Sequence, residues 1–319
     1  MPNYLQRKTG HNYTQPSAYL ITVVVKDRLP LLGQLMGDSA QSAAIEATSL
    51  GRQVISAFYD IEQKVKDKTG CNVQVVQYQL MPDHFHGILY VRDQLPPTWH
   101  LGRIIGAWKG ACSRAFTHTA MLTHDQENVL TLFENGYNDR PLLSKDQLQR
   151  WIAYLRDNPR RLWLKRHQSE RLKKVFDFTL NNTDRRYTAV GNTFLITYPE
   201  RIQVRCHRNL TDAEIRDEVA HYLHLAHQGK VLVSPFISPA ERVVYDACYA
   251  EQLPMIRIVN RALDGRFIYP SGRDFDACCA GFLLVLAPYP QGDEHTAAKR
   301  ISRSQCLDMN DIASEIASL

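Results

Sequence analysis

Residues 73–91 read VQVVQYQLMPDHFHGILYV, and this stretch decides the fold of the first half of the chain. Runs rich in β-branched and aromatic residues precede and follow a Pro-Asp pair, which is typical of tight turns. The pattern predicts two strands joined by a short connection. On the second strand, His84 and His86 are two residues apart, so both imidazoles point to one face while Phe85 points to the other.

The segments around this stretch alternate between the periods of strands and helices. The predicted strands are Tyr19–Val25, Val73–Leu80 and Phe85–Val91, and the predicted helices are Ser42–Lys68, Leu101–Phe116 and Lys145–Asn158. The third helix is expected to end near Asn158, because Pro159 disfavours the helical conformation at the residue before it. This order predicts helices packed on one face of a small antiparallel sheet, an α+β arrangement.

The second half of the chain has a different rhythm. A polar stretch at 176–192 predicts a linker between a first domain, 1–175, and a second, 193–290, with a tail at 291–319. The strands predicted there are Thr193–Thr197, Ile202–Cys206, Lys230–Phe236, Pro254–Val259 and Phe282–Ala287, and the helices are Thr211–His227 and Pro239–Gln252. Alternating strands and helices predict a parallel, doubly wound α/β domain.

Charge is concentrated in one part of the chain. The 319 residues carry a net charge of +5, whereas residues 150–174 hold nine basic and two acidic side chains, an excess of +7. A concentrated basic segment favours an anionic partner such as nucleic acid, and a solvated helix face is the alternative.

Cysteine usage and hydropathy predict the compartment. The seven cysteines are odd in number and include no C-x-x-C pair, which favours reduced thiols over disulfides or a zinc site. The first 19 residues are polar, and no apolar run approaches the length of a membrane span. We therefore expect a soluble, cytoplasmic protein that has no membrane partner.

The histidine pair is the feature that carries chemistry. Two neutral imidazoles with one oxygen ligand can hold a divalent metal ion and leave positions open for a substrate. The His-x-His spacing alone is a weak signal, since such a pair can equally be a satisfied pair in a core. The sequence around the pair decides between these interpretations.

Three motifs in one order resemble a known family. They are LMPDHFHGIL at 80–89, FENGYNDR at 133–140 and WIAYLRDNP at 151–159. Together they resemble the HUH single-tyrosine transposases, especially the REP-associated tyrosine transposases and their insertion-sequence relatives. The likeness covers about residues 15–165, half of the chain.

The resemblance implies a ferredoxin-like HUH domain that nicks and rejoins single-stranded DNA, at hairpin ends, as a homodimer. Tyr154 would attack the phosphodiester to form a 5′-phosphotyrosine and release a 3′-hydroxyl. His84, His86 and Asn158 would hold the metal, Mg²⁺ or Mn²⁺. A tyrosine hydroxyl has an ordinary pKa near 10, so it needs a phosphate activated by the metal.

Alternatives to these assignments remain open. Tyr154 can instead be core filler on its helix, since Tyr59, Tyr137 and Tyr187 are also available. The candidate DNA contacts are the basic residues Lys109, Arg114, Arg140, Arg156, Arg160, Arg161 and Lys165. Lys109 and Arg114 can equally be solvent-facing charges.

The second domain resembles, more loosely, the Rossmann-like core of the DNA-processing protein A family, whose members bind single-stranded DNA. The matching segments are VRCHRNLT at 204–211, VLVSPFIS at 231–238, YPSG at 269–272 and GFLLVLAP at 281–288. Glycines of that family are replaced by His207, Pro235 and Pro239. The turn at 234–241 predicts a phosphate seat at a helix N-terminus, and a purely structural or dimer-supporting domain is the alternative.

Three functions compete on this basis. A transposase is favoured by the complete set of His84, His86, Tyr154 and Asn158. A non-catalytic hairpin-binding or regulatory protein, derived from a transposase, is the alternative. A replication-initiator or relaxase nickase shares the chemistry, but the Tyr-x3-Asn-Pro ending fits it less well.

Overall fold

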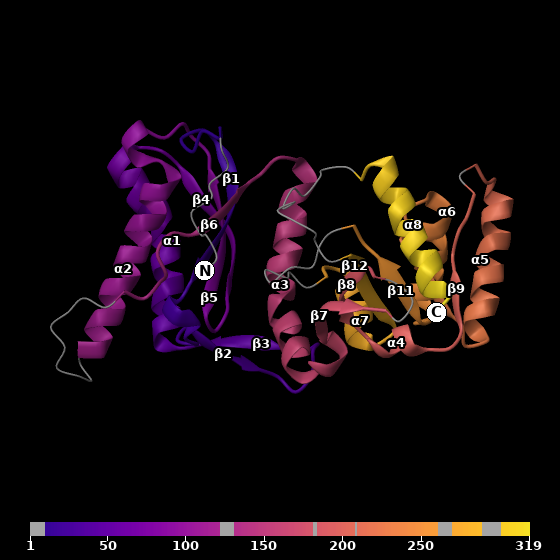
Figure 1. Cartoon of the computed structure of the whole chain (residues 1–319). Helices are drawn as coiled ribbons and strands as arrows, with labels where there is room; N and C mark the ends of the chain where they lie inside the picture. Colours follow the sequence, from indigo (N-terminus) through magenta and orange to yellow (C-terminus); the bar gives the residue numbers. More distant parts are fainter. Residues whose placement is uncertain (1–9, 122–130, 181–183, 208, 261–269, 289–300) are drawn as a thin grey trace. The chain divides into compact units, whose positions relative to one another are not determined.

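The computed structural model describes residues 10–121, 131–180, 184–207, 209–260, 270–288 and 301–319 (Figure 1). The chain forms two compact units, Met1–Leu164 and Lys165–Leu319. Helix α3 (Lys145–His167) begins in the first unit and ends in the second. Each unit has its own sheet, and the two are described in turn.

The first unit is built on an antiparallel sheet with the strand order β4-β5-β1-β6. Its strands are β1 (Ser17–Val24), β4 (Val73–Leu80), β5 (His84–Val91) and β6 (Asn138–Pro141), and a separate hairpin is formed by β2 (Gly33–Met36) and β3 (Ala44–Ala47). Apart from the hairpin, the chain runs β1-α1-β4-β5-α2-β6, with α1 at Ser49–Thr69 and α2 at Leu101–Met121. This order is the ferredoxin-like one, so the predicted α+β class and ferredoxin-like sheet are confirmed.

The ends of α1 show how local chemistry sets its length. The Thr48 hydroxyl accepts the Gly51 backbone N–H at 3.0 Å, and Gly70 closes the helix with a φ of 73°. The expected start at Ser42 is wrong, because residues 44–47 pair with β2 as β3. The predicted end at Lys68 is one residue from the observed end at Thr69.

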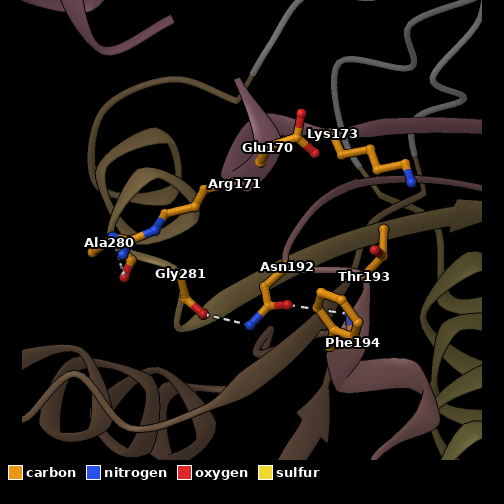
Figure 2. Close-up of a pocket in the computed structure, with 8 residues that line it drawn as sticks. All are labelled: Glu170, Arg171, Lys173, Asn192, Thr193, Phe194, Ala280 and Gly281. Carbon is orange, nitrogen blue, oxygen red and sulfur yellow. Dashed lines mark hydrogen bonds between the residues drawn. The ribbon is translucent and has the colours of Figure 1, made fainter. Parts of the chain in front are cut away.

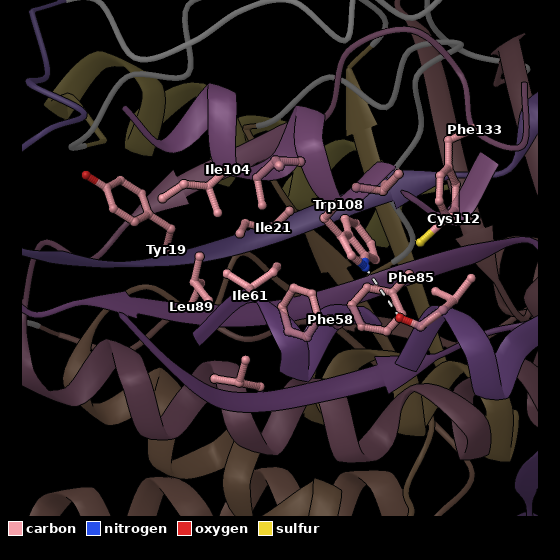
Figure 3. Packing of buried hydrophobic residues seen from close by; sticks show 14 of the residues in the cluster. Tyr19, Ile21, Phe58, Ile61, Phe85, Leu89, Ile104, Trp108, Cys112 and Phe133 are labelled. Carbon is pink, nitrogen blue, oxygen red and sulfur yellow. Dashed lines mark hydrogen bonds between the residues drawn. The ribbon is translucent and has the colours of Figure 1, made fainter. Parts of the chain in front are cut away.

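The core of this unit lies between α1, α2 and one face of the sheet (Figure 3). Phe58 of α1 and Trp108 of α2 pack against Phe85 of β5, with ring centroids 4.8 and 5.1 Å from it. All three side chains are buried. Because side chains alternate along β5, burial of Phe85 in this core directs His84 and His86 to the opposite face.

Helix α3 covers that opposite face. Trp151 and Leu155 of α3 form a second apolar cluster with Leu20 of β1 and Ile88 of β5. Figure 1 shows α1 and α2 on one side of the sheet and α3 on the other. The expectation that helices cover one face is therefore wrong for α3, whose apolar stripe needs a second surface to bury against.

The second unit contains a six-stranded sheet in the order β7-β8-β12-β11-β10-β9. The strands are β7 (Lys174–Thr179), β8 (Arg186–Gly191), β9 (Arg201–Gln203), β10 (Val231–Ser234), β11 (Met255–Ile258) and β12 (Leu283–Pro288). The helices are α4 (Phe194–Thr197), α5 (Asp212–His227), α6 (Pro239–Ala250), α7 (Arg273–Ala280) and α8 (Arg303–Ala317). Strands β9 to β12 are parallel, whereas β8 and β7 are antiparallel to their neighbours.

The predicted parallel strands are confirmed, but the double winding is wrong. The four parallel strands follow one another in chain order, so their right-handed crossovers run in one direction and place α5, α6 and α7 on one face. The other face is covered by α8, whose buried Met309, Ile312 and Ile316 pack on the sheet. Capping boxes begin α5 at Thr211 and α6 at Ser238, as their sequences predict.

Three further expectations are corrected. The predicted linker 176–192 holds most of β7 and all of β8, because its residues complete the sheet beside β12. The predicted tail 291–319 includes α8, an amphipathic helix that closes the core. The predicted strand Thr193–Thr197 is helix α4.

Candidate functional site: a histidine pair beside a helical tyrosine

His84 and His86 lie at the start of β5, on the face covered by α3. Their ring centroids are 4.7 Å apart and their planes are nearly perpendicular, at 86°. The antiparallel register places Thr22 of β1 directly opposite His86. The two imidazoles therefore converge on one point of the sheet surface, as the spacing predicts.

Each imidazole is held through Nδ1. The Nδ1 atom of His84 lies 2.6 Å from the carboxylate of Asp83, and Nδ1 of His86 lies 2.8 Å from the hydroxyl of Thr22. Both rings therefore direct Nε2 away from these partners. In metalloproteins, a hydrogen bond to the second ring nitrogen orients a metal-binding histidine in this way.

Charges around the pair set its protonation. The pKa of His86 lies well below its ordinary value because the ring is buried and because His84 and Arg140 are close, while Asp83 opposes the shift. Burial alone would raise the pKa of Asp83, but its contacts with His84 and Arg28 lower it to about 2. His86 is therefore neutral near pH 7, which is the form that binds a metal ion.

Sequence reasoning missed Thr22, Asp83 and Arg28. The Arg28 guanidinium donates to Asp83 at 3.0 Å, and residues 27 and 28 have φ of 55° and 52°. Glu134 stabilises that turn by accepting the Asp27 backbone N–H at 2.8 Å. The position of Asp83 next to His84 was the one available signal, since the role of Thr22 depends on strand register.

Tyr154 lies next to the pair. Its ring centroid is 5.9 Å from that of His86, and its side chain is 42% exposed. Among the other tyrosines considered from the sequence, Tyr59 packs against Tyr78, Tyr137 borders the α1–α2 core, and Tyr187 is buried in the second unit. Tyr154 is therefore the member of this group that accompanies the histidines.

Asn158 follows one turn after Tyr154, on the same face of α3. Its side chain is 8% exposed, and its Nδ2 atom has no hydrogen-bond partner among the described residues. The unpaired Nδ2 group is a donor, so it is suited to an acceptor such as a phosphate oxygen, whereas a metal ion would need the amide oxygen. The described residues contain no group of three or more His, Cys, Asp and Glu side chains that could hold a metal ion.

The expectation that α3 ends near Asn158 is wrong. The helix continues through Pro159 to His167. Proline removes one backbone donor, but the following residues are good helix formers and Leu164 is buried, so packing outweighs this cost.

Among the candidate DNA contacts, Arg140 is the one whose charge acts on the histidine pair. It lies on β6 opposite Leu20, on the face that carries His86, and its charge contributes to the lowered His86 pKa. On α3, the side chain of Arg156 is exposed.

Arg160 and Arg161 of α3 are less exposed than Arg156, and the DNA-binding roles of Arg160, Arg161 and Lys165 stay predictions. Arg160 is paired with Asp157 at 2.5 Å, and Arg161 is buried. Lys165 is the first residue of the second unit.

Lys109 and Arg114 are not brought to the histidines. Both lie on α2, across the sheet from the pair. The Lys109 ammonium group donates to the carbonyl oxygens of Glu134 and Gly136 at 2.6 Å each, and burial lowers its pKa. These bonds give Lys109 a structural role in the loop before β6, and its DNA-binding role stays a prediction.

The predicted phosphate seat in the second unit is filled by a side chain. The buried carboxylate of Glu241 accepts the backbone N–H groups of Ile237 and Ser238 at 2.9 and 3.2 Å. The Ser234 hydroxyl accepts the backbone N–H of Phe236 at 3.0 Å. These donors are the ones a phosphate would use, so the expectation of a phosphate seat at this turn is wrong.

The fold and the site together define an α+β protein whose antiparallel sheet carries a histidine pair beside an exposed helical tyrosine. No helix in the described part of the chain has the length and apolarity needed to cross a membrane. No protein-family model and no curated protein matches the chain.

Several solved structures are similar to it. A REP-associated tyrosine transposase bound to a REP hairpin is 13% identical, with 48% of this chain and 73% of that chain covered and a TM-score of 0.29. DNA processing protein A from Helicobacter pylori, solved for its single-stranded DNA binding mode, is 19% identical over 45% of this chain and 65% of its own, with a TM-score of 0.34. A proposed transposase from Deinococcus radiodurans R1 is 20% identical over 47% of this chain and 98% of its own, with a TM-score of 0.26. All three TM-scores are below 0.5, so these similarities do not establish what the chain does. Its activity has to be inferred from its own residues.

Proposed function

We propose that this chain is a metal-dependent endonuclease and strand transferase of the transposase type, which acts on single-stranded DNA through Tyr154. One observation carries the proposal. Both histidines are held through Nδ1 with Nε2 directed away, and the exposed Tyr154 lies beside them in the same unit. The three sequence motifs support the same chemistry and favour hairpin ends as the substrate.

The residues present fit a divalent metal ion. His84 and His86 would bind it through Nε2, and Asn158 through its amide oxygen, which is the type of ligand that Mg²⁺ and Mn²⁺ favour. When bound, the ion polarises the scissile phosphate and stabilises its developing negative charge. Imidazole is a softer ligand than Mg²⁺ prefers, so we expect tighter binding of Mn²⁺.

The chain's own groups supply the nucleophile and the orientation. The Tyr154 hydroxyl oxygen forms a bond to phosphorus while the bond from phosphorus to the 3′ oxygen breaks. The phenol proton passes to water, and the departing 3′ oxygen takes a proton from water. Arg140, on the same sheet face, would pair with the phosphate. The 5′-phosphotyrosine keeps the bond energy, so a 3′-hydroxyl can reverse the step without ATP.

A labelling experiment tests this proposal directly. The full chain is incubated with single-stranded hairpin DNA and Mn²⁺, Mg²⁺ or EDTA, and the products are separated on a denaturing gel. A 5′-phosphotyrosine predicts that 3′-labelled DNA becomes attached to protein, while 5′-labelled DNA gives a free shortened fragment. Both products should require the metal. Attachment of the 5′-labelled fragment would contradict the assigned polarity.

A non-catalytic hairpin-binding protein is the second candidate. The described residues contain no group of three His, Cys, Asp or Glu side chains that could bind a metal ion. The proposed metal site therefore depends on an amide, and this favours the second candidate. Hairpin binding without cleavage, across varied hairpins and both metals, would support this candidate. The homodimer remains a prediction, because Tyr154 already reaches His86 within one chain.

Asp83→Asn should weaken Mn²⁺ binding by roughly 10- to 100-fold, because the carboxylate that orients His84 is lost. Isothermal titration of the full chain with Mn²⁺ measures this effect. Asp60→Asn is the matched control, since Asp60 is an exposed carboxylate of α1 that pairs with Lys64. Equal Mn²⁺ affinity of Asp83→Asn and the wild type would show that Asp83 does not position a metal ligand.

A further inference from the structure

The second unit contains a pocket that the proposed chemistry does not use. It has a volume of about 410 Å³, in the range of small-ligand sites. Its lining residues come from the segment before β7, the end of β8 and the turn before β12: Glu170, Arg171, Lys173, Asn192, Thr193, Phe194, Ala280 and Gly281 (Figure 2). The pocket is therefore at the amino-terminal end of β12, whereas the turn filled by Glu241 follows the carboxyl end of β10.

Phe194 is presented to solvent at this pocket. Its side chain is 80% exposed, the largest exposed fraction among the large apolar side chains described. Asn192 fixes its backbone: the amide Nδ2 donates to the Gly281 carbonyl at 2.7 Å, and Oδ1 accepts the Phe194 N–H at 3.1 Å. An aromatic ring held at a pocket with its faces in water can serve as a stacking platform.

The polar groups around the ring have different roles. The Arg171 guanidinium donates to the carbonyls of Cys279 and Ala280 at 3.3 Å each, so it stabilises the end of α7. Figure 2 shows Arg171 directed toward Ala280, while Lys173 and Thr193 lie on the side of Phe194. Lys173 is exposed, and Thr193 makes no capping hydrogen bond to α4. A cation, a hydroxyl and an aromatic face are thus grouped together.

We propose that this pocket binds one unpaired nucleotide of single-stranded DNA. The base stacks on Phe194, the Lys173 ammonium group pairs with a neighbouring phosphate, and Thr193 and Glu170 offer hydrogen-bonding groups to the polar edge of the base. Base pairing would hide that edge and stacking in a duplex would cover the faces of the base, so the pocket selects single strands. The choice of DNA rests on the proposed function, but the binding step does not involve Tyr154.

Fluorescence anisotropy with labelled oligothymidylate, which forms no hairpin, tests the site in the full chain carrying Tyr154→Phe. Phe194→Ala should weaken binding by roughly 5- to 100-fold, the range expected for one stacked base. Lys173→Ala should weaken binding and reduce the slope of log affinity against log salt by about 0.7, the contribution of one phosphate contact.

Matched controls are available in the same unit. Leu307→Ala removes an exposed apolar side chain of α8, and Arg242→Ala removes an exposed cation of α6; neither should change the affinity. Oligothymidylate containing 5-iodouracil should photocrosslink to the peptide that carries Phe194, and Phe194→Leu should remove that crosslink. Circular dichroism confirms that each variant is folded.

The outcomes separate this site from the catalytic proposal. Wild-type affinity in folded Phe194→Ala, or a crosslink that maps elsewhere, would overturn the nucleotide site while leaving the Tyr154 adduct untouched. Absence of any adduct together with weakened binding in Phe194→Ala would retain the site and remove the nuclease. Equal loss of affinity in Leu307→Ala would also overturn it, because the effect would then not be local.

Discussion

Tyr154→Phe should abolish the covalent protein–DNA adduct and reduce strand cleavage by at least about 1,000-fold, since no second oxygen replaces the nucleophile. The phenylalanine ring keeps the packing beside His86, and the lost hydroxyl belongs to a side chain that is 42% exposed. Folding should therefore be unaffected. The measurement is the rate of adduct formation on a denaturing gel, with 3′-labelled hairpin DNA and Mn²⁺.

Tyr59→Phe is the matched control for this variant. Tyr59 is 49% exposed and lies on α1, across the sheet from the histidines, so its loss should leave the rate unchanged. Hairpin binding should survive in both variants. An adduct that still forms in Tyr154→Phe would assign the nucleophile to another residue.

Gly51→Ala should destabilise the first unit by roughly 2–3 kcal/mol, as expected when a methyl group is forced into a packed site. A Cβ atom at Gly51 would lie 2.0 Å from the backbone oxygen of Leu32 and 2.9 Å from Leu80 Cδ2. That oxygen also accepts the N–H of Thr48, the N-cap of α1, at 3.0 Å. Relief of the clash therefore requires α1 or the preceding loop to move. Urea denaturation followed by circular dichroism measures the change.

Gly106→Ala should have the opposite effect on the stability of the first unit. A Cβ atom at Gly106, on α2, would meet nothing within 4 Å. Replacing a helical glycine with alanine should then stabilise the unit by about 0.5–1 kcal/mol, through lower backbone entropy of the unfolded chain. If the midpoint of urea unfolding is the same for Gly51→Ala and the wild type, the close approach of α1 to Leu32 is not rigid.

Much of the secondary structure follows from local sequence. The β-branched runs, the Pro-Asp turn, Gly70 and the two capping boxes act within a few residues, so each could be predicted without knowledge of the fold. Pro159 shows the limit of such rules. Its local preference to end a helix is outweighed, because the helix that continues to His167 buries the side chain of Leu164.

Longer-range organisation was predicted less well. The segment 176–192 is polar and lacks a clear period, yet it supplies most of β7 and all of β8, because pairing of β8 with β12 and of β7 with β8 satisfies their backbone groups. The winding of the second sheet depends on strand order, which no local pattern specifies. Lys109 shows the same limit for a side chain, since its carbonyl partners lie 25 and 27 residues away in sequence.

For the histidine pair, the sequence by itself determined that two imidazoles share one face of a strand, because the alternation of side chains is a property of the backbone. The tertiary structure decided what surrounds them. Strand register brought Thr22 to His86, the turn at residues 26–28 brought Arg28 to Asp83, and burial of an apolar stripe of α3 placed Tyr154 beside His86. These contacts join residues up to tens of positions apart, and packing of the whole unit is the physical cause that selects them.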